Sequence, residues 1–263
     1  MRVIIRNDYE DMSTWAADYI AEKISARPAG RPFVLGLPTG SSPLGVYKKL
    51  IEKNRACEVS FANVITFNMD EYLGLPRGHE QSFWHFMHEN FFDHLVDMKP
   101  ENINILDGMA EDPEEECRRY EEKIAAAGGI DLFLGGVGVD GHLAFNEPGT
   151  SLTSRTGLRS LTAETRIINS RFFGGDPEKV PEQALTVGIG TVMDARELLI
   201  LISGPSKQRA LAAAVEGSVS PEWPCSVIKT HENAIIVCDE DACGELTAYT
   251  YSYYVKSERA GKN

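Results

Sequence analysis

The sequence predicts an α/β fold with a largely parallel sheet, and three observations support this prediction. Seven short apolar runs recur along the 263 residues, and segments with the spacing of amphipathic helices lie between most of them. No internal repeat and no Pro-, Gly- or Ser-rich linker divides the chain. Such alternation is typical of a parallel sheet with helices packed against it. We therefore expect one domain that spans residues 1–263.

The expected elements follow from length and periodicity. Runs of three to five apolar residues fit strands, and apolar residues three or four apart fit helices. The expected strands cover residues 3–5, 33–37, 64–67, 132–134, 185–189, 198–202 and 234–237. The expected helices cover residues 12–24, 44–52, 83–95, 113–126 and 207–216. Residues 147–181 show neither period, and a loop region of that length in a compact domain is usually functional, often as a lid.

Composition and charge restrict the partners. The apolar fraction of 43% is that of a globular protein, and no stretch approaches the roughly 18 apolar residues of a membrane span. The N-terminus lacks the pattern of a signal peptide, so we expect a cytoplasmic protein. A net charge of −13 argues against nucleic acid and anionic membranes as partners. Five scattered cysteines without a C-x-x-C pair are expected to be reduced thiols, mostly in the core.

Two expected strands are followed by segments that suit an anion at the start of a helix. Residues 38–43 read PTGSSP, in which Ser42 suits the N-cap and Pro43 the first helical turn. Free N–H groups and the helix dipole attract anions there. Residues 203–207 read SGPSK, and Lys207 at a helix start opposes the dipole unless an anion lies beside it. Either segment could also be an ordinary turn.

Two adjacent acids, Asp70 and Glu71, follow the expected strand 64–67. Neighbouring residues of an extended chain face opposite sides, so only one of these carboxylates can face a pocket at the strand end. The pattern does not choose between them. Acids at a strand end are also common on a solvated surface.

The most informative segment is residues 136–148, GVGVDGHLAFNEP. Its glycines have the spacing of a dinucleotide fingerprint, but Pro148 interrupts the helix that they should open, and no acid follows at the expected distance. We therefore expect no dinucleotide cofactor. Asp140 and His142 share one side if the chain is extended, and Glu147 follows closely. A carboxylate on one imidazole nitrogen leaves the other for acid–base chemistry, although a lone histidine is more often structural.

These four segments are expected to meet in one pocket, because ligands of open parallel sheets bind outside the carboxyl ends of the strands. The pocket would hold two anion-binding helix starts, a carboxylate and a carboxylate–histidine–carboxylate group. We expect no metal ion and no cofactor. This set of groups indicates proton transfer on a phosphorylated small molecule.

At these residues the sequence resembles the glucosamine-6-phosphate deaminase family. The matching stretches are LGLPTGSSPLGVYK (35–48), VSFANVITFNMDEYLGLP (59–76), GGVGVDGHLAFNEPG (135–149), SRFF (170–173) and ALTVGIGT (184–191). The resemblance implies a Rossmann-like three-layer α/β/α sandwich with a mostly parallel sheet and a lid at about residues 162–181. It also implies conversion of glucosamine 6-phosphate and water to fructose 6-phosphate and ammonia, without a cofactor.

The resemblance further implies roles for individual residues. Asp70 would enolise the open-chain sugar by moving the C2 proton, and His142, supported by Asp140 and Glu147, would open the pyranose ring. The implied phosphate contacts are Thr39, Gly40, Ser41, Ser42, Arg171 and Lys207. Imidazole suits ring opening because its pKa lies near neutrality. Asp70 should be partly buried, since enolisation needs a stronger base than a solvated carboxylate.

Regulation is expected to be weak. Long family members are often hexamers, and allosteric ones bind N-acetylglucosamine 6-phosphate between subunits. The corresponding positions are Thr150, Gly157, Arg159, Ser160 and Tyr253. Gly157 replaces a basic residue and removes a charge-assisted hydrogen bond of about 1.5–3 kcal/mol, unless Arg155 substitutes. Residues 223–231, WPCSVIKTH, also depart from the family's usual leucine–glutamine pair.

Other function classes stay open at this point. A 6-phosphogluconolactonase-like hydrolase would share the fold but would not need the aspartate of FNMDEY. A non-catalytic sugar-phosphate sensor normally follows a DNA-binding helix-turn-helix, whereas this chain begins with an expected strand. A plain aldose–ketose isomerase would release no ammonia.

Overall fold

Two sheets organise the computed structural model, which describes residues 1–28 and 30–260. The main sheet has seven strands in the order β1-β10-β9-β6-β2-β3-β5, and each neighbouring pair is parallel. These strands are β1 (Arg2–Arg6), β2 (Phe33–Leu37), β3 (Val64–Asn68), β5 (Ile103–Asn104), β6 (Leu132–Gly136), β9 (Glu197–Ile202) and β10 (Ala234–Asp239). The predicted parallel sheet is confirmed.

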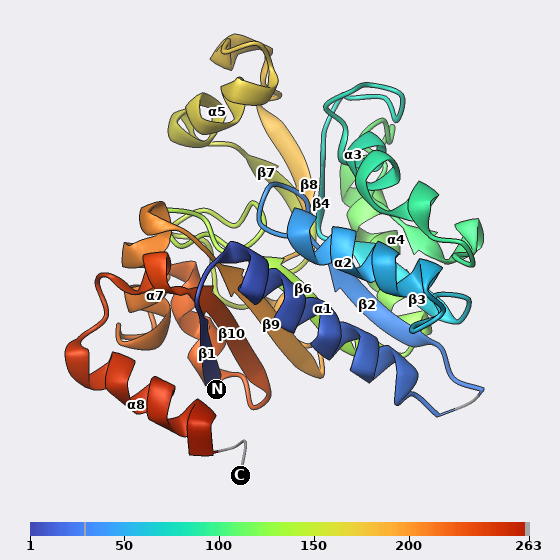
Figure 1. Ribbon diagram of the computed structural model, residues 1–263. Coiled ribbons are helices and arrows are strands. Elements are labelled where there is room, and N and C mark those ends of the chain that lie inside the picture. The colour runs from blue at the N-terminus through green and yellow to red at the C-terminus, as the bar shows by residue number, and fades with distance from the viewer. Residues whose placement is uncertain (29, 261–263) are drawn as a thin grey trace.

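Helices cover both faces of the main sheet (Figure 1). One face packs against α1 (Tyr9–Ser25), α2 (Leu44–Arg55) and α3 (Phe83–Asn90). The other packs against α4 (Pro113–Ala126), α6 (Ile189–Met193) and α7 (Gln208–Val215), while α8 (Ala248–Ala260) lies beside β1. Because side chains alternate along a strand, Val34 and Leu35 of β2 enter different core clusters. The three-layer α/β/α sandwich is confirmed.

A small antiparallel sheet stands above the main one. It consists of β4 (Asp70–Tyr72), β8 (Gln183–Thr186) and β7 (Gly157–Ser160), in the order β4-β8-β7. The segment from β7 through α5 (Ala163–Asn169) rises from this sheet (Figure 1). The region 147–181 is therefore not one structureless loop. Tertiary pairing with β8 orders β7, although its sequence carries no clear strand pattern.

Two expected elements end earlier than predicted. The run 185–189 leaves its strand at Thr186, because Ser154 Oγ accepts the N–H of Ile189 (3.0 Å) and α6 begins there. The helix expected over 83–95 stops at Asn90, whose amide donates to the Phe86 carbonyl (2.8 Å). A 3-10 turn over Phe92–His94 follows instead.

The sheet order brings the predicted functional segments together. Strands β9, β6, β2 and β3 lie side by side, so their carboxyl ends are neighbours. From β2 the sheet grows to β3 and β5 on one side, and β6 is then added on the other. A crevice opens at such a change of direction in α/β sheets, and it is the usual place of a ligand.

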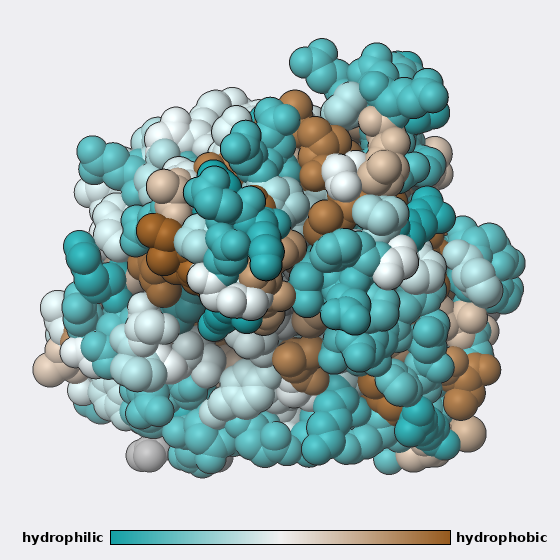
Figure 2. Space-filling model, turned by 90° about the horizontal axis from the view of Figure 1, so that it is seen from above, coloured by the Kyte–Doolittle hydropathy of each residue, from teal (hydrophilic) through white to brown (hydrophobic). Residues whose placement is uncertain are grey.

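The surface on the side of α5 is mainly hydrophilic, with apolar groups between the polar ones (Figure 2). No helix in residues 1–28 and 30–260 is long and apolar enough to cross a membrane. All five cysteines are free, and four of them are buried, as the sequence predicts.

Candidate active site

A cavity of about 240 Å³ lies at the carboxyl ends of the neighbouring strands β9, β6, β2 and β3. Residues 38–43 after β2, Asp70 after β3, His142 after β6 and Lys207 after β9 all line it. Arg171, from the segment after α5, lines it as well. The structure thus places eight of the predicted site residues, from five segments distant in sequence, around one cavity.

Asp70 and Glu71 face different surroundings. Asp70 lines the cavity, is 5% exposed, and its Oδ1 is buried without a hydrogen-bond partner among the described residues. Burial raises the pKa of Asp70 to about 8, the Glu71 carboxylate adds to the rise, and the Thr39 hydroxyl opposes it. A carboxylate destabilised in this way is a stronger base than a solvated one.

Glu71 is occupied by the backbone instead. Its carboxylate accepts the N–H groups of Tyr72 (2.8 Å), Phe83 (2.9 Å) and Trp84 (2.9 Å). The last two are at the start of α3, where the helix dipole favours a negative charge. Burial raises the pKa of Glu71 to about 7 against the opposing effect of these hydrogen bonds. The sequence pattern did not decide which of the two acids faces the pocket. In the structure Asp70 lines the cavity, and Glu71 accepts hydrogen bonds from the start of α3.

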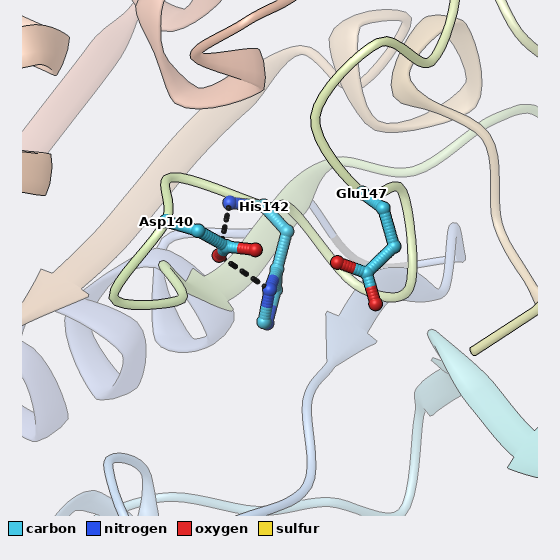
Figure 3. A group of neighbouring side chains, drawn as sticks. All are labelled: Asp140, His142 and Glu147. Carbon is cyan, nitrogen blue, oxygen red and sulfur yellow. Dashed lines mark hydrogen bonds and ion pairs between the residues drawn. The ribbon is translucent and has the colours of Figure 1, made fainter. Parts of the chain in front are cut away.

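Asp140 and His142 form a pair in which His142 lines the cavity (Figure 3). His142 Nδ1 lies 2.7 Å from Asp140 Oδ1, and the backbone N–H of His142 donates to the same oxygen at 3.2 Å. Burial acts to raise the pKa of Asp140, but the hydrogen bonds and charge of His142 outweigh it and lower this pKa to about 2. The pairing holds one ring nitrogen and leaves Nε2 for a ligand.

The turn that carries this pair is tightly built. A Cβ at Gly138 would lie 2.3 Å from the His142 ring and 2.6 Å from Asp140 Oδ1, so only glycine lets the pair fold back over the turn. The N–H of Gly138 donates to the His142 carbonyl (2.9 Å), and the N–H of Cys225 donates to the Gly141 carbonyl (2.8 Å). The glycines whose spacing resembles a dinucleotide fingerprint thus shape the turn that pairs Asp140 with His142.

Glu147 links the turn to the segment above the cavity. Thr165 of α5 donates to Glu147 Oε1 at 2.5 Å, and Thr162 donates to it at 3.3 Å. Glu147 Oε2 is buried and has no hydrogen-bond partner among the described residues. The ligand atoms of Asp140, His142 and Glu147 lie within 4.8 Å of one another, a spacing that a metal ion could also use. Because Asp140 already holds Nδ1, the arrangement is equally that of an acid–base group.

The loop 38–43 lines the cavity and contains unpaired backbone N–H groups. The backbone N–H groups of residues 39–42 donate to no other described residue, and all four of these residues line the cavity. The sequence suggested Ser42 as the N-cap of α2, and this prediction is wrong. Pro43 is the N-cap and makes no side-chain capping bond. Successive free N–H groups of this kind form an anion-binding concavity.

Two cations complete the polar lining. Burial lowers the pKa of the Lys207 amine, the Asp140 carboxylate opposes this effect, and Arg171 adds to it. Two cations that destabilise each other beside free N–H groups are the surroundings that a bound phosphate would stabilise. In a chain of net charge −13, this is a local concentration of positive charge.

Several cavity residues were not singled out from the sequence. Tyr72 lines the cavity, and its hydroxyl accepts a hydrogen bond from Asn169 of α5 (3.0 Å). The ring of Phe173 packs edge-on against the same tyrosine, and Thr165 lines the cavity from α5. The available signal was the unusual length of the segment 147–181, which pointed to a lid without identifying its side chains.

The predicted effector positions do not form one site within the chain. Gly157, Arg159 and Ser160 lie on β7, whereas Tyr253 lies on α8, beside β1 and well apart from β7 (Figure 1). Thr150 lies in the loop between Glu147 and β7. Tyr253 is 55% exposed. A site built from both groups therefore needs a second copy of the chain.

Arg155 is unavailable as a substitute for the missing cation. Its guanidinium contacts Glu121 Oε2 at 2.6 Å and Asp194 Oδ2 at 2.5 Å. Glu121 also accepts hydrogen bonds from Thr156. These contacts hold Arg155 toward α4 and α6.

The chain was compared with families and proteins of known activity. The family model described as glucosamine-6-phosphate isomerases/6-phosphogluconolactonase matches residues 7–237. Glucosamine-6-phosphate deaminase of Parabacteroides distasonis is 58% identical over 261 residues, which cover 98% of this chain and 96% of the relative. The protein of the same name from Aliivibrio fischeri is 56% identical over 260 residues, which cover 98% of this chain and 97% of the relative.

Solved structures give the same picture. A monomeric glucosamine-6-phosphate deaminase matches with a TM-score of 0.88 at 40% identity, over 92% of this chain and 98% of that one. The 6-phosphogluconolactonase from Thermotoga maritima matches with a TM-score of 0.71 at 21% identity, over 91% of this chain and 99% of that one. The second likeness concerns the fold alone.

Proposed function

The chain belongs to the family of glucosamine-6-phosphate isomerases and 6-phosphogluconolactonases, and from this premise we propose that it is a glucosamine-6-phosphate deaminase. It converts glucosamine 6-phosphate and water to fructose 6-phosphate and ammonia. Identity of 56–58% over nearly the full length of the named deaminases carries this conclusion. The deaminase of known structure is also twice as similar in sequence as the lactonase, at 40% against 21% identity.

Ring opening is assigned to His142. Opening a cyclic hemiacetal removes a proton from the C1 hydroxyl and supplies one to the ring oxygen, and an imidazole can do both. The contact of Nδ1 with Asp140 leaves Nε2 as the nitrogen that exchanges protons. Glu147, with one carboxylate oxygen held by Thr165 and the other without a described partner, supports the ring from the side of α5.

Enolisation is assigned to Asp70. Once the chain form of the sugar lies in the cavity, a buried carboxylate removes the proton at C2 and returns it at C1, while a proton from the amino group passes to the C1 oxygen and C2 becomes an imine. Water then adds to this imine, and loss of ammonia leaves the ketone at C2. The burial and raised pKa of Asp70 support this assignment. Glu71 is excluded from this step by its three hydrogen bonds to the backbone.

The substrate phosphate is assigned to the loop 39–42 together with Arg171 and Lys207. The free N–H groups of Thr39, Gly40, Ser41 and Ser42 and the two cations around the cavity support this assignment. Binding energy from the phosphate would hold C1 and C2 between His142 and Asp70. The segment from Thr162 to about residue 181 is proposed to act as the lid, because its residues Thr165, Asn169 and Arg171 line the cavity.

The remaining expectations from the sequence are part of the proposal. We propose that residues 1–263 form one deaminase domain, that the enzyme is cytoplasmic and that it assembles into a hexamer. The exposed Tyr249 and Tyr253 of α8 are aromatic surfaces that another copy would cover. The deaminase of known structure is described as monomeric, so the assembly is to be measured by light scattering. N-acetylglucosamine 6-phosphate is proposed as a weak effector at most.

The test is a comparison of substrates. The purified protein is given glucosamine 6-phosphate in one assay and the lactone of 6-phosphogluconate in another. Release of ammonia from the first and no catalysed hydrolysis of the second are expected. Hydrolysis of the lactone without release of ammonia would favour the lactonase, and binding without turnover would favour a sensor.

A further inference from the structure

The start of α2 is capped by a residue from another helix. Pro43, its N-cap, offers no side-chain hydrogen bond, and the first N–H groups of a helix have no partners within it. The hydroxyl of Tyr9, the first residue of α1, accepts the N–H of Gly45 at 2.8 Å. The one proton of this hydroxyl is shared between the carbonyl oxygens of Ser41 (3.0 Å) and Ser42 (3.1 Å).

Tyr9 does not line the cavity, so its hydroxyl acts on the loop 39–42 from behind. The Ser41 carbonyl shares its peptide plane with the N–H of Ser42, so the hydroxyl of Tyr9 fixes the direction of that N–H. Its contact with the Ser42 carbonyl holds the end of the loop at Pro43 against α1. The N–H groups of residues 39–42 have no hydrogen-bond partner among the described residues. At the other end of the loop the Tyr47 hydroxyl donates to the Pro38 carbonyl, whose peptide plane carries the N–H of Thr39, so Tyr9 holds the end at Ser42. The helix start also approaches α1 closely, since a Cβ at Gly45 would lie 2.3 Å from Ser13 Oγ and 3.0 Å from the Tyr9 ring.

We propose that Tyr9 is a positioning residue for substrate phosphate, because its hydroxyl holds the loop 39–42 in the conformation that presents its N–H groups to the cavity. The inference rests on the proposed binding of a sugar phosphate in this cavity. Loss of the hydroxyl lets the loop change its conformation, and binding of the phosphate must then reorder it. The chemistry at C1 and C2, which depends on His142 and Asp70, is not touched.

The test uses Tyr9→Phe with Tyr19→Phe as its matched control. Both tyrosines lie on α1, are partly buried and use their hydroxyls in hydrogen bonds; Tyr19 donates to Glu197 Oε2 at 2.8 Å. Tyr9→Phe is expected to raise the KM for glucosamine 6-phosphate about three- to tenfold, the effect of one or two hydrogen bonds, with kcat nearly unchanged. The Kd of inorganic phosphate, measured by calorimetry, rises by the same factor. Tyr19→Phe leaves both constants unchanged.

A second variant reaches the loop by another route. Gly45→Ala inserts a methyl group between α2 and Ser13 and pushes the helix start away from Tyr9, so the Kd of phosphate is expected to rise here as well. This variant decides the question if Tyr9→Phe does not fold. The proposal is overturned if Tyr9→Phe and Gly45→Ala bind inorganic phosphate as tightly as the unmodified protein does. It is also overturned if Tyr19→Phe weakens phosphate binding as much as Tyr9→Phe.

Failure of the inference and failure of the proposed function are distinguishable. Ammonia release by the unmodified protein, with an unchanged KM and phosphate Kd in Tyr9→Phe, overturns the role of Tyr9 alone. Phosphate binding that Tyr9→Phe weakens, without any ammonia release from glucosamine 6-phosphate, supports the role of Tyr9 and overturns the deaminase.

Discussion

His142 Nδ1 lies 2.7 Å from Asp140 Oδ1, and this contact determines which ring nitrogen can serve the substrate. A carboxylate that accepts the Nδ1 proton fixes the tautomer with Nε2 unprotonated. It also stabilises the ring when Nε2 takes up a proton. The pair therefore has the organisation that ring opening requires.

Asp140→Asn is expected to impair ring opening. The amide can donate to Nδ1 and so stabilise the wrong tautomer, and general acid–base catalysis of about two to four powers of ten would be lost from kcat. The Kd of inorganic phosphate should not rise, because Asp140 does not line the cavity and the substitution only removes a negative charge near Lys207. Turnover of the cyclic substrate at the original rate would remove the pair from the mechanism.

Asp70→Asn is expected to abolish deamination while the phosphate still binds, since the amide keeps the shape but not the basic oxygen. In the unmodified enzyme, kcat/KM should rise with pH toward about 8, as Asp70 loses its proton. The adjacent Glu71 titrates nearby, so the profile belongs to the pair. A kcat/KM that does not change between about pH 6 and about pH 8 would contradict the assignment of Asp70 as the base.

The same substitution is expected to stabilise the fold at high pH. The folded-state pKa of Asp70, about 8, lies above its ordinary value of 3.8. Between these values the unfolded state holds fewer protons, so this carboxyl makes the fold less stable as pH rises. The Tm of Asp70→Asn should therefore exceed that of the unmodified protein by more at about pH 9 than at about pH 4. An equal difference in Tm at the two pH values would show that the fold does not destabilise the ionised form of Asp70.

Glu71→Gln is expected to have the opposite consequences. Its buried carboxylate accepts three backbone N–H groups, and the amide can satisfy fewer of them, so about 1–3 kcal/mol of unfolding free energy should be lost. The folded fraction should keep its turnover, with the pH profile shifted to lower pH because the Glu71 charge no longer raises the pKa of Asp70. Denaturant unfolding and kcat measured on one preparation separate the two effects; a loss of kcat without a loss of stability would reverse the roles of the two acids.

Lys207→Ala is expected to raise the KM for glucosamine 6-phosphate tenfold or more, because a charge-assisted hydrogen bond contributes about 1.5–3 kcal/mol. Glucosamine without phosphate should be little affected. Lys229→Ala is the matched control: this lysine donates to the Ala213 carbonyl (3.2 Å) near the other end of α7. It should lower the Tm and leave the KM unchanged. An unchanged KM in Lys207→Ala would place the phosphate elsewhere.

Activation by N-acetylglucosamine 6-phosphate is expected to be weak or absent. Gly157 offers no cation, and Arg155 is held by Glu121 and Asp194. Gly157→Arg should strengthen activation if the enzyme is oligomeric, since it restores a cation and a Cβ at this position would crowd only the flexible end of Arg159. Saturation curves with and without the effector measure this. A sigmoidal curve that becomes hyperbolic at micromolar effector in the unmodified enzyme would contradict the argument.

Six strands of the main sheet could be predicted from the sequence because they read as short apolar runs, most of them buried on both faces. The two-residue strand β5 was not predicted. Strand β2, FVLGL, is buried throughout and has the predicted bounds. The small sheet could not be predicted in the same way. Its strands β4 and β7 have three and four residues and are ordered by pairing with β8, which local sequence does not reveal.

The site divides along the same line. The residues at strand ends could be located because parallel strands bring their carboxyl ends together. The choice between Asp70 and Glu71 could not be made from the pattern, because it depends on the hydrogen bonds that the first N–H groups of α3 donate to Glu71. The role of Tyr9 was equally invisible, because the contact joins residues 36 positions apart. Long-range hydrogen bonds of this kind have no local signature.

The central claim is tested most directly by the products of one reaction. Glucosamine 6-phosphate is incubated with the unmodified protein and with Asp70→Asn, and ammonia and fructose 6-phosphate are measured in the same samples. The unmodified protein is expected to form the two products in equal amounts, and Asp70→Asn neither at a comparable rate. Fructose 6-phosphate and ammonia formed equally fast by Asp70→Asn, or no ammonia from the unmodified protein, would contradict the account.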